Sequence, residues 1–319
     1  MEIEGTKELN SILSKAKLGS QPSARPPVAV EISPQGALAA ATPAPGQPPV
    51  YAFEPLPEGA LIPGIGEHNL RAPELIANAM RAALGQVSPR THSITLVVPD
   101  TVVRVFVLDF DSLSSKVAEA IPVLRFRLRK MIPFDVEHTG ISYQVLVENK
   151  TECKVLAAGI PGLILAEYEA AARQAGFEPG AVLPTSLAAL GAVESPDPVL
   201  TANLSTHALT TSITNGQDLL LYRTLDLPED PALRLQEVQR GIAVATAYYE
   251  DKLGAPPSRL YYAGVGGSGN SAAEDFAHWI GFPELTVIDL APRPETGAAT
   301  PLGNLISLAG VVGALAGAR

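Results

Sequence analysis

The stretch VAVEISPQGA at residues 28–37 returns in altered form as LTANLSTHAL at residues 200–209. An offset of 172 residues aligns the two stretches, placing Ile32 over Leu204 and Ser33 over Ser205. Each stretch has the pattern of a strand, a turn of small residues and a returning strand. Because the same pattern opens both halves of the chain, it indicates two lobes with the same fold.

Apolar patterning predicts a mixed α/β order of elements in both halves. In the first half a three-stranded meander precedes a helix near 72–85, a strand pair at 93–100 and 102–110, and a helix near 114–131. In the second half the turn Asn215-Gly216 joins two alternating apolar runs, which is a strong hairpin signal. A helix, a strand, a glycine-rich turn, a helix and a strand follow it.

These patterns predict an α/β protein with four segments. They are a flexible N-terminal tail and linker at 1–27, a first lobe at 28–196 with a subdomain inserted at about 101–150, a second lobe at 197–300, and a terminal helix at 301–319.

Composition excludes several classes of function. The 23 Lys and Arg against 33 Asp and Glu give a net charge of −10, which repels nucleic acid over most of the surface. The single cysteine, Cys153, cannot form an internal disulfide, and the five histidines lack metal-ligand spacing. No stretch at the N-terminus has the pattern of a secretion signal, and glycines interrupt the apolar stretch 301–318. We therefore expect a cytoplasmic protein with no membrane span of its own.

Three stretches of the chain resemble the family of the type IV pilus assembly protein PilM, within the actin-like ATPase superfamily. They are FRLRKMIPFDVEHTGISYQVL at 126–146, AVATAYYEDKLGAPPSRLYYAGVGGSG at 243–269, and LGNLISLAGVVGALAGAR at 302–319. With the two opening hairpins, the resemblance covers roughly residues 28–319. It implies an actin-like fold of two ribonuclease-H-like lobes, with the terminal helix returning to the first lobe.

The resemblance also implies a function and a partner. Such a protein is a cytoplasmic adaptor at the inner membrane that binds the short cytoplasmic tail of a PilN-like single-span protein, along with other pilus assembly proteins. The tail would lie along a basic and apolar segment of the first lobe. The candidate partner-binding residues are Arg125, Arg129, Lys130, Pro133 and Phe134.

The resemblance further implies an ATP cleft between the lobes, and the sequence departs from its pattern. Actin-like ATPases open each lobe with Asp-x-Gly, whereas this chain has Glu31-Ile32-Ser33 and Asn203-Leu204-Ser205. Losing a carboxylate should weaken Mg²⁺ binding. The chain is also too short after Leu227 for the family's second-lobe subdomain, so we expect a reduced one. Candidate cleft residues are Glu31, Ser33, Gln35, Gly36, Asn203, Ser205, Thr206, Gly264, Gly266, Gly267 and Ser268.

We therefore expect a degenerate cleft and no efficient hydrolysis, with ATP and Mg²⁺ binding left open. Two alternatives stay open as well. Gly264, Gly266 and Gly269 form a GxGxxG motif, and Asp289 follows 20 residues later, as in dinucleotide-binding proteins. Actin-like adaptors of cell division or type II secretion are the other alternative. No set of residues in the sequence forms a persuasive catalytic site.

Overall fold

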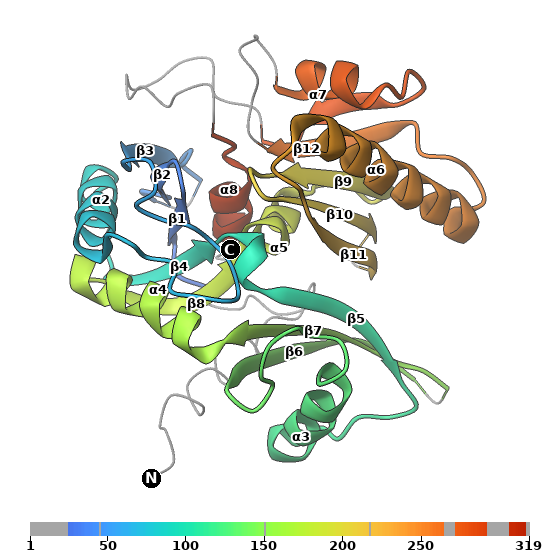
Figure 1. The fold of residues 1–319 in the computed structure, drawn as a ribbon, viewed down its shortest axis with the longest axis horizontal. Helices are drawn as coiled ribbons and strands as arrows, with labels where there is room; N and C mark the ends of the chain where they lie inside the picture. The colour runs from blue at the N-terminus through green and yellow to red at the C-terminus, as the bar shows by residue number, and fades with distance from the viewer. Residues whose placement is uncertain are drawn as a thin grey trace.

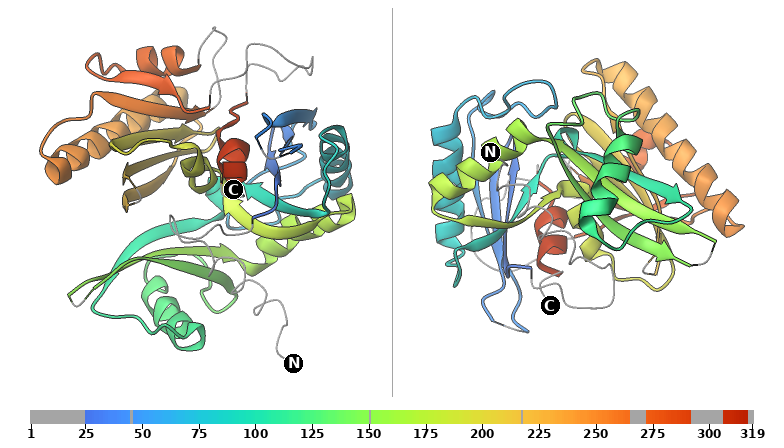
Figure 2. Two further views of the ribbon diagram at one scale, coloured as in Figure 1. Left: turned by 180° about the vertical axis from the view of Figure 1, so that it is seen from behind. Right: turned by 90° about the horizontal axis from the view of Figure 1, so that it is seen from below.

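The computed structural model describes residues 25–44, 46–149, 151–216, 218–264, 272–291 and 306–316. Within these ranges the chain forms two five-stranded sheets and a separate three-stranded sheet, with helices packed on their faces (Figures 1 and 2). Residues 1–24 of the predicted tail lie outside the described residues, as do residues 301–305 and 317–319 of the predicted terminal helix.

The first lobe is built on a sheet of strand order β3-β2-β1-β4-β8. Its first three strands are antiparallel, and β4 and β8 continue the sheet in parallel to β1. Helices α2 and α4 pack against one face through a large apolar core. The bounds are β1 Val28–Ser33, β2 Gly36–Ala41, β3 Val50–Pro55, α2 Pro73–Gln86, β4 Ser93–Val98, α4 Gly162–Ala175 and β8 Glu178–Pro184.

The second lobe repeats this topology, with strand order β11-β10-β9-β12-β13. Glu31 lies opposite Leu38 in the first hairpin and Asn203 lies opposite Thr210 in the second, so the register is also conserved at the offset of 172. The predicted duplication is therefore confirmed. The bounds are β9 Pro198–Leu204, β10 Ala208–Asn215, β11 Asp218–Asp226, α6 Pro231–Leu253, β12 Arg259–Gly264, α7 Ala272–Ile280 and β13 Thr286–Asp289.

A small subdomain is inserted between β4 and α4 of the first lobe. Its sheet has the order β5-β7-β6, and α3 covers one face through a separate apolar core. Cys153 packs in that core, where it is 1% exposed. The bounds are β5 Arg104–Phe110, α3 Val117–Leu128, β6 Thr139–Glu148 and β7 Cys153–Pro161.

Two sequence-based expectations about this region differ from the structure. The predicted strand pair is wrong, because β4 pairs with β1 and β8, whereas β5 pairs with β7. The short 3-10 helix η1, Asp100–Val102, lies between β4 and β5 and separates the two sheets. The inserted unit also extends past 150, because β7 lies between β5 and β6 in the same sheet.

Helix α8, Ala309–Ala316, lies between the two lobes at the centre of the molecule (Figure 1). It packs on the helix α5, Thr185–Ala189, and on the 3-10 helix η2, Leu190–Ala192. Its apolar cluster combines first-lobe residues with Ala263 of β12. The return of the terminal helix to the first lobe thus follows the expectation from the family resemblance.

A second apolar cluster joins the lobes on the other side of the joint. Tyr222 and Leu219 of β11 pack with Leu156 of β7 and Leu190 of η2. Only residues 227–230 separate β11 from α6, so the second-lobe subdomain is reduced, as expected. None of the described helices is both long enough and apolar enough to cross a membrane.

Candidate functional site

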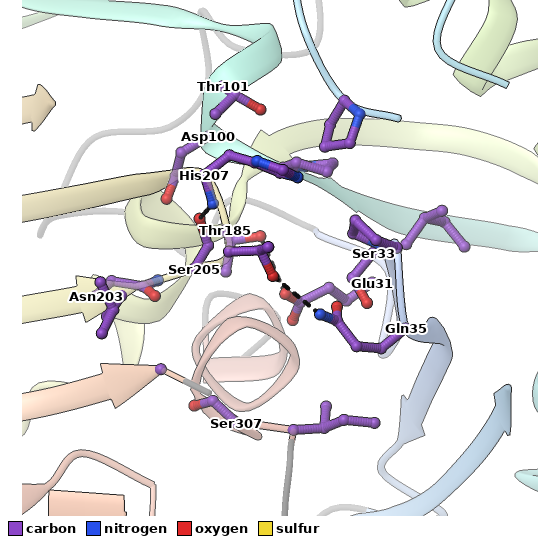
Figure 3. Close-up of a pocket in the computed structure, with 18 residues that line it drawn as sticks. Glu31, Ser33, Gln35, Asp100, Thr101, Thr185, Asn203, Ser205, His207 and Ser307 are labelled. Carbon is purple, nitrogen blue, oxygen red and sulfur yellow. Dashed lines mark hydrogen bonds between the residues drawn. The ribbon is translucent and has the colours of Figure 1, made fainter. Parts of the chain in front are cut away.

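A cleft lies between the lobes where the turns of the two repeated hairpins face each other (Figure 3). Pro99 with the start of η1, the start of α5, the end of β12, Pro63 and residues 306–307 ahead of α8 complete its lining. The structure brings together most of the cleft residues predicted from the sequence, namely Glu31, Ser33, Gln35, Asn203, Ser205, Thr206 and Gly264. Gly266, Gly267 and Ser268 lie outside the described residues.

The two hairpin turns are joined by a direct hydrogen bond across the cleft. The Gln35 side-chain amide donates to the Thr206 hydroxyl at 3.1 Å. At the edge of the joint, the Arg104 guanidinium of β5 also pairs with the Asp226 carboxylate of β11 at 2.8 Å. Side chains of the protein therefore connect the lobes at the place where the family resemblance implies phosphates.

The two serines of the hairpins make hydrogen bonds within their own turns. The Ser205 hydroxyl donates to Ala208 O at 3.2 Å and accepts from Ala208 N at 3.0 Å, and the Ser33 hydroxyl donates to Gly36 O at 3.4 Å. Neither serine has a positive φ, so serine stands at both turns without backbone strain. Gly36 does not line the cleft; a side chain there would collide with Glu54 of β3.

The Glu31 carboxyl group is buried beneath helix α8. The Thr185 hydroxyl donates to Glu31 Oε1 at 3.0 Å, while Oε2 has no hydrogen-bond partner among the described residues and lies against Gly310 of α8. Burial raises the pKa of Glu31 to about 7, the Thr185 hydrogen bond opposes this shift, and the nearby Asp100 carboxyl adds to it. Helix α8 therefore covers Oε2, while Glu31 as a whole is half-buried and lines the cleft.

Asp100, which the sequence analysis did not single out, connects the lobes at the base of the cleft. It is 5% exposed and accepts hydrogen bonds from the backbone N–H of Ser186 at 2.9 Å and from the Ser186 hydroxyl. It also accepts from the Thr210 hydroxyl of the second lobe at 3.3 Å. Burial raises the pKa of Asp100 despite these hydrogen bonds, which lower it. The position of Asp100 two residues after the apolar strand 93–98 shows that it follows a strand, but does not reveal its partners.

The described residues of the cleft do not fit a magnesium nucleotide. Asn203, 8% exposed at the position equivalent to Glu31, offers an amide whose Nδ2 has no partner. Mg²⁺ prefers several oxygen ligands with open access. Asp100 already accepts hydrogen bonds from three donors, and α8 covers Glu31. No Lys or Arg lines this part of the cleft, and burial together with nearby Arg234 lowers the pKa of His207.

The candidate partner-binding residues lie at the junction of α3 with the loop 132–138. The Arg125 guanidinium donates to Val136 O, and Arg129 pairs with Glu137, so both arginines hold the loop against α3. Lys130 and Pro133 are exposed, and Phe134 packs partly on the subdomain core. The neighbouring Leu163 was missed by sequence reasoning, because helical position alone does not show exposure.

The strand order of the second lobe can be compared with that of dinucleotide-binding proteins. In the second lobe β12 and β13 are parallel, and Tyr262 lies opposite Asp289, as the motif requires. However, β13 is the edge of the sheet, and β9 with its antiparallel hairpin lies on the other side of β12. This is not the doubly wound parallel sheet in which that motif binds dinucleotides. Gly266 and Gly269 lie outside the described residues.

Two duplicated lobes, an inserted subdomain and an interlobe cleft make up an actin-like fold. A chain of the PilM-PilN type IV pilus biogenesis complex is similar to this protein, with a TM-score of 0.71 and 18% identity over 93% of this chain and 99% of that chain. At this identity the likeness shows the fold, and it confirms the resemblance to PilM at that level.

Two further solved structures show weaker likeness. The cytoplasmic domain of EpsL, an inner membrane component of the type II secretion system of Vibrio cholerae, has a TM-score of 0.49 and 13% identity, covering 90% of this chain and 92% of that chain. A Bacteroides thetaiotaomicron protein with an actin-like ATPase fold has a TM-score of 0.48 and 10% identity, covering 83% and 91%. Both scores are too low to carry an argument. No protein-family model matches the chain, and no curated protein matches it.

Proposed function

We propose that this protein is a PilM-like cytoplasmic adaptor that binds the cytoplasmic tail of a PilN-like inner-membrane protein, with lobes that stay joined without nucleotide. The observation that carries the proposal is the likeness to a chain of the PilM-PilN complex over almost the whole length of both chains. The adaptor would sit at the inner membrane through its partners, in a type IV pilus or a related envelope machine, and other assembly proteins would bind the same scaffold.

The direct links between the lobes support the second part of the proposal. Gln35 contacts Thr206 across the cleft, Asp100 accepts a hydrogen bond from Thr210, and two apolar clusters bridge the joint. A nucleotide switch needs a ligand that binds two states of the lobes with different affinity. The described cleft offers no cation to phosphates, so we infer that the protein is not an ATPase and acts as a scaffold.

A partner tail would dock along what we call the tail surface, defined by Arg125, Arg129, Lys130, Pro133 and Phe134. We extend the proposed surface to Leu163 at the start of α4, because Gly162 N donates to His138 O at 2.9 Å and joins α4 to the loop 132–138. Leu163 is 76% exposed, more than any other large apolar side chain in the described part of the protein. An apolar anchor beside cations suits a short tail with apolar side chains.

Cross-linking inside cells tests this surface. A photoreactive amino acid in place of Leu163 is expected to join the protein to the cytoplasmic tail of a single-span inner-membrane protein, identified by mass spectrometry of the cross-linked peptides. Leu233 of α6 is the matched control, because it is 53% exposed and lies in the other lobe. Cross-links from position 163 to soluble proteins alone, or equal cross-links from both positions to the same tail, would contradict the tail surface.

A further inference from the structure

Helix α3 presents an apolar face to solvent. Ala120, Leu124 and Leu128 recur every four residues and are buried against the sheet of the inserted subdomain. At about 100° per residue, Val123 and Phe126 point away from that sheet. Val123 is 46% exposed and Phe126 is 69% exposed. Such exposure of a phenylalanine on the outer side of a helix marks a candidate interaction surface.

Positive charge is concentrated around α3. Residues 117–131 hold four Lys and Arg against the single acid Glu119, in a chain whose net charge is −10, and two of the four, Arg125 and Arg129, point toward the loop 132–138. Glu119 is paired with Lys116 at 3.0 Å. Arg127 and Lys130 are exposed, and neither forms an ion pair with any described residue. We call Val123, Phe126 and Arg127 of α3, together with Lys130 and Met131 of the turn that follows the helix, the outer face of α3.

The outer face is distinct from the tail surface, although Lys130 borders both. Arg125 and Arg129 point toward the loop 132–138, where they bond Val136 O and Glu137. Phe126 and Arg127 lie further around the helix. Figures 1 and 2 show α3 at the far end of the inserted subdomain, away from the second lobe. The outer face therefore belongs to a protruding helix, whereas a bound peptide usually lies in a groove.

We propose that the outer face of α3 contacts an anionic lipid surface. A planar layer of headgroups accepts a protruding helix, the ammonium and guanidinium groups attract anionic lipid, and Phe126 enters the interface. This orientation rests on the proposed function, since a partner tail docked beside α3 holds this end of the molecule near the bilayer. The lipid contact is weak by itself. It adds a second attachment to the membrane beside the one that the partner tail provides.

The test is binding of the purified full-length protein to vesicles of phosphatidylcholine with and without phosphatidylglycerol. We expect binding to the anionic vesicles that weakens as salt is added. The double variant Phe126→Ser with Arg127→Glu should bind the anionic vesicles about tenfold more weakly or worse. Val244→Ser with Arg240→Glu on α6 is the matched control, with the same change of charge and an apolar side chain 43% exposed. It should bind like the unchanged protein.

Three results would overturn the proposal: no preference for anionic vesicles, equal loss in both double variants, or no loss in the α3 variant. Cross-linking from position 163 in the α3 variant separates this proposal from the tail surface. If cross-linking persists while vesicle binding falls, both the tail surface and the lipid contact are supported. If cross-linking disappears and vesicle binding is unchanged, the outer face binds protein, and the proposed lipid contact is wrong.

Discussion

Replacing Gly313 by alanine is expected to displace helix α8 and to lower the free energy of unfolding by about 3 kcal/mol. A Cβ at Gly313 would collide with the backbone carbonyl of Ala188 in α5, and the Gly313 carbonyl in turn occupies the space next to Gly191. The obstacles are backbone atoms of packed helices, which cannot move aside as a flexible side chain can. Buried apolar residues of α8, such as Val311 and Leu315, would lose their contacts with both lobes.

Denaturant unfolding followed by circular dichroism measures this loss, and hydrogen exchange in residues 309–316 shows whether α8 has undocked. Gly85→Ala on α2 is the control, because no atom lies within 4 Å of a Cβ built there. Alanine stabilises a helix relative to glycine by up to about 1 kcal/mol, so the control should be as stable as the unchanged protein or more so. A Gly313→Ala protein with unchanged stability and unchanged exchange would mean that α8 does not join the lobes.

Replacing Glu31 by glutamine is expected to remove a pH-dependent loss of stability. Folding raises the pKa of Glu31 from 4.5 to about 7, so the folded state holds this proton more tightly than the unfolded chain does. Stability from Glu31 is therefore fully present below pH 4.5, falls as the pH rises toward 7, and stays low above that. At about 1.36 kcal/mol per pKa unit, the loss amounts to about 3 kcal/mol.

The measured quantity is the difference in unfolding free energy between the unchanged protein and Glu31→Gln, followed from acid to mildly alkaline pH. A constant cost of burying the amide cancels in this pH dependence. Both proteins retain Asp100, so the difference reports the titration of Glu31 together with its interaction with Asp100. The unchanged protein should lose stability relative to the variant as the pH rises. A difference that stays flat across this range would place Glu31 in contact with water or with a cation, contrary to its position beneath α8.

Much of the fold could be predicted because local sequence patterns determine its strands, turns and helices. The repeated hairpins, the Asn215-Gly216 turn and the short connection after Leu227 all depend on neighbours in sequence, and the structure has the duplicated lobes that they predict. The pairing of β5 could not be read in this way. Its paired residues in β7 lie 43 to 55 positions later, and strand pairing at that distance depends on the whole subdomain.

The sequence predicted most of the residues that line the candidate site. It did not predict what each of them contacts. The offset of 172 placed Glu31 and Asn203 at one cleft, and the structure brings them there. The sequence alone does not show that the Glu31 carboxyl lies against α8. That contact depends on Gly310, which is almost 280 residues away in the chain. Asp100 was missed for the same reason, because its partners Ser186 and Thr210 come from two distant segments.

The central claim, an adaptor whose lobes are joined without nucleotide, is tested most directly by calorimetric titration of the purified protein with Mg·ATP. The account predicts no binding heat, because the described cleft presents an amide at position 203, a covered carboxyl group at Glu31 and no lysine or arginine. The same titration on Asn203→Asp shows whether a second carboxylate restores a metal site. Micromolar binding by the unchanged protein would contradict the claim and would make nucleotide a regulator of partner binding.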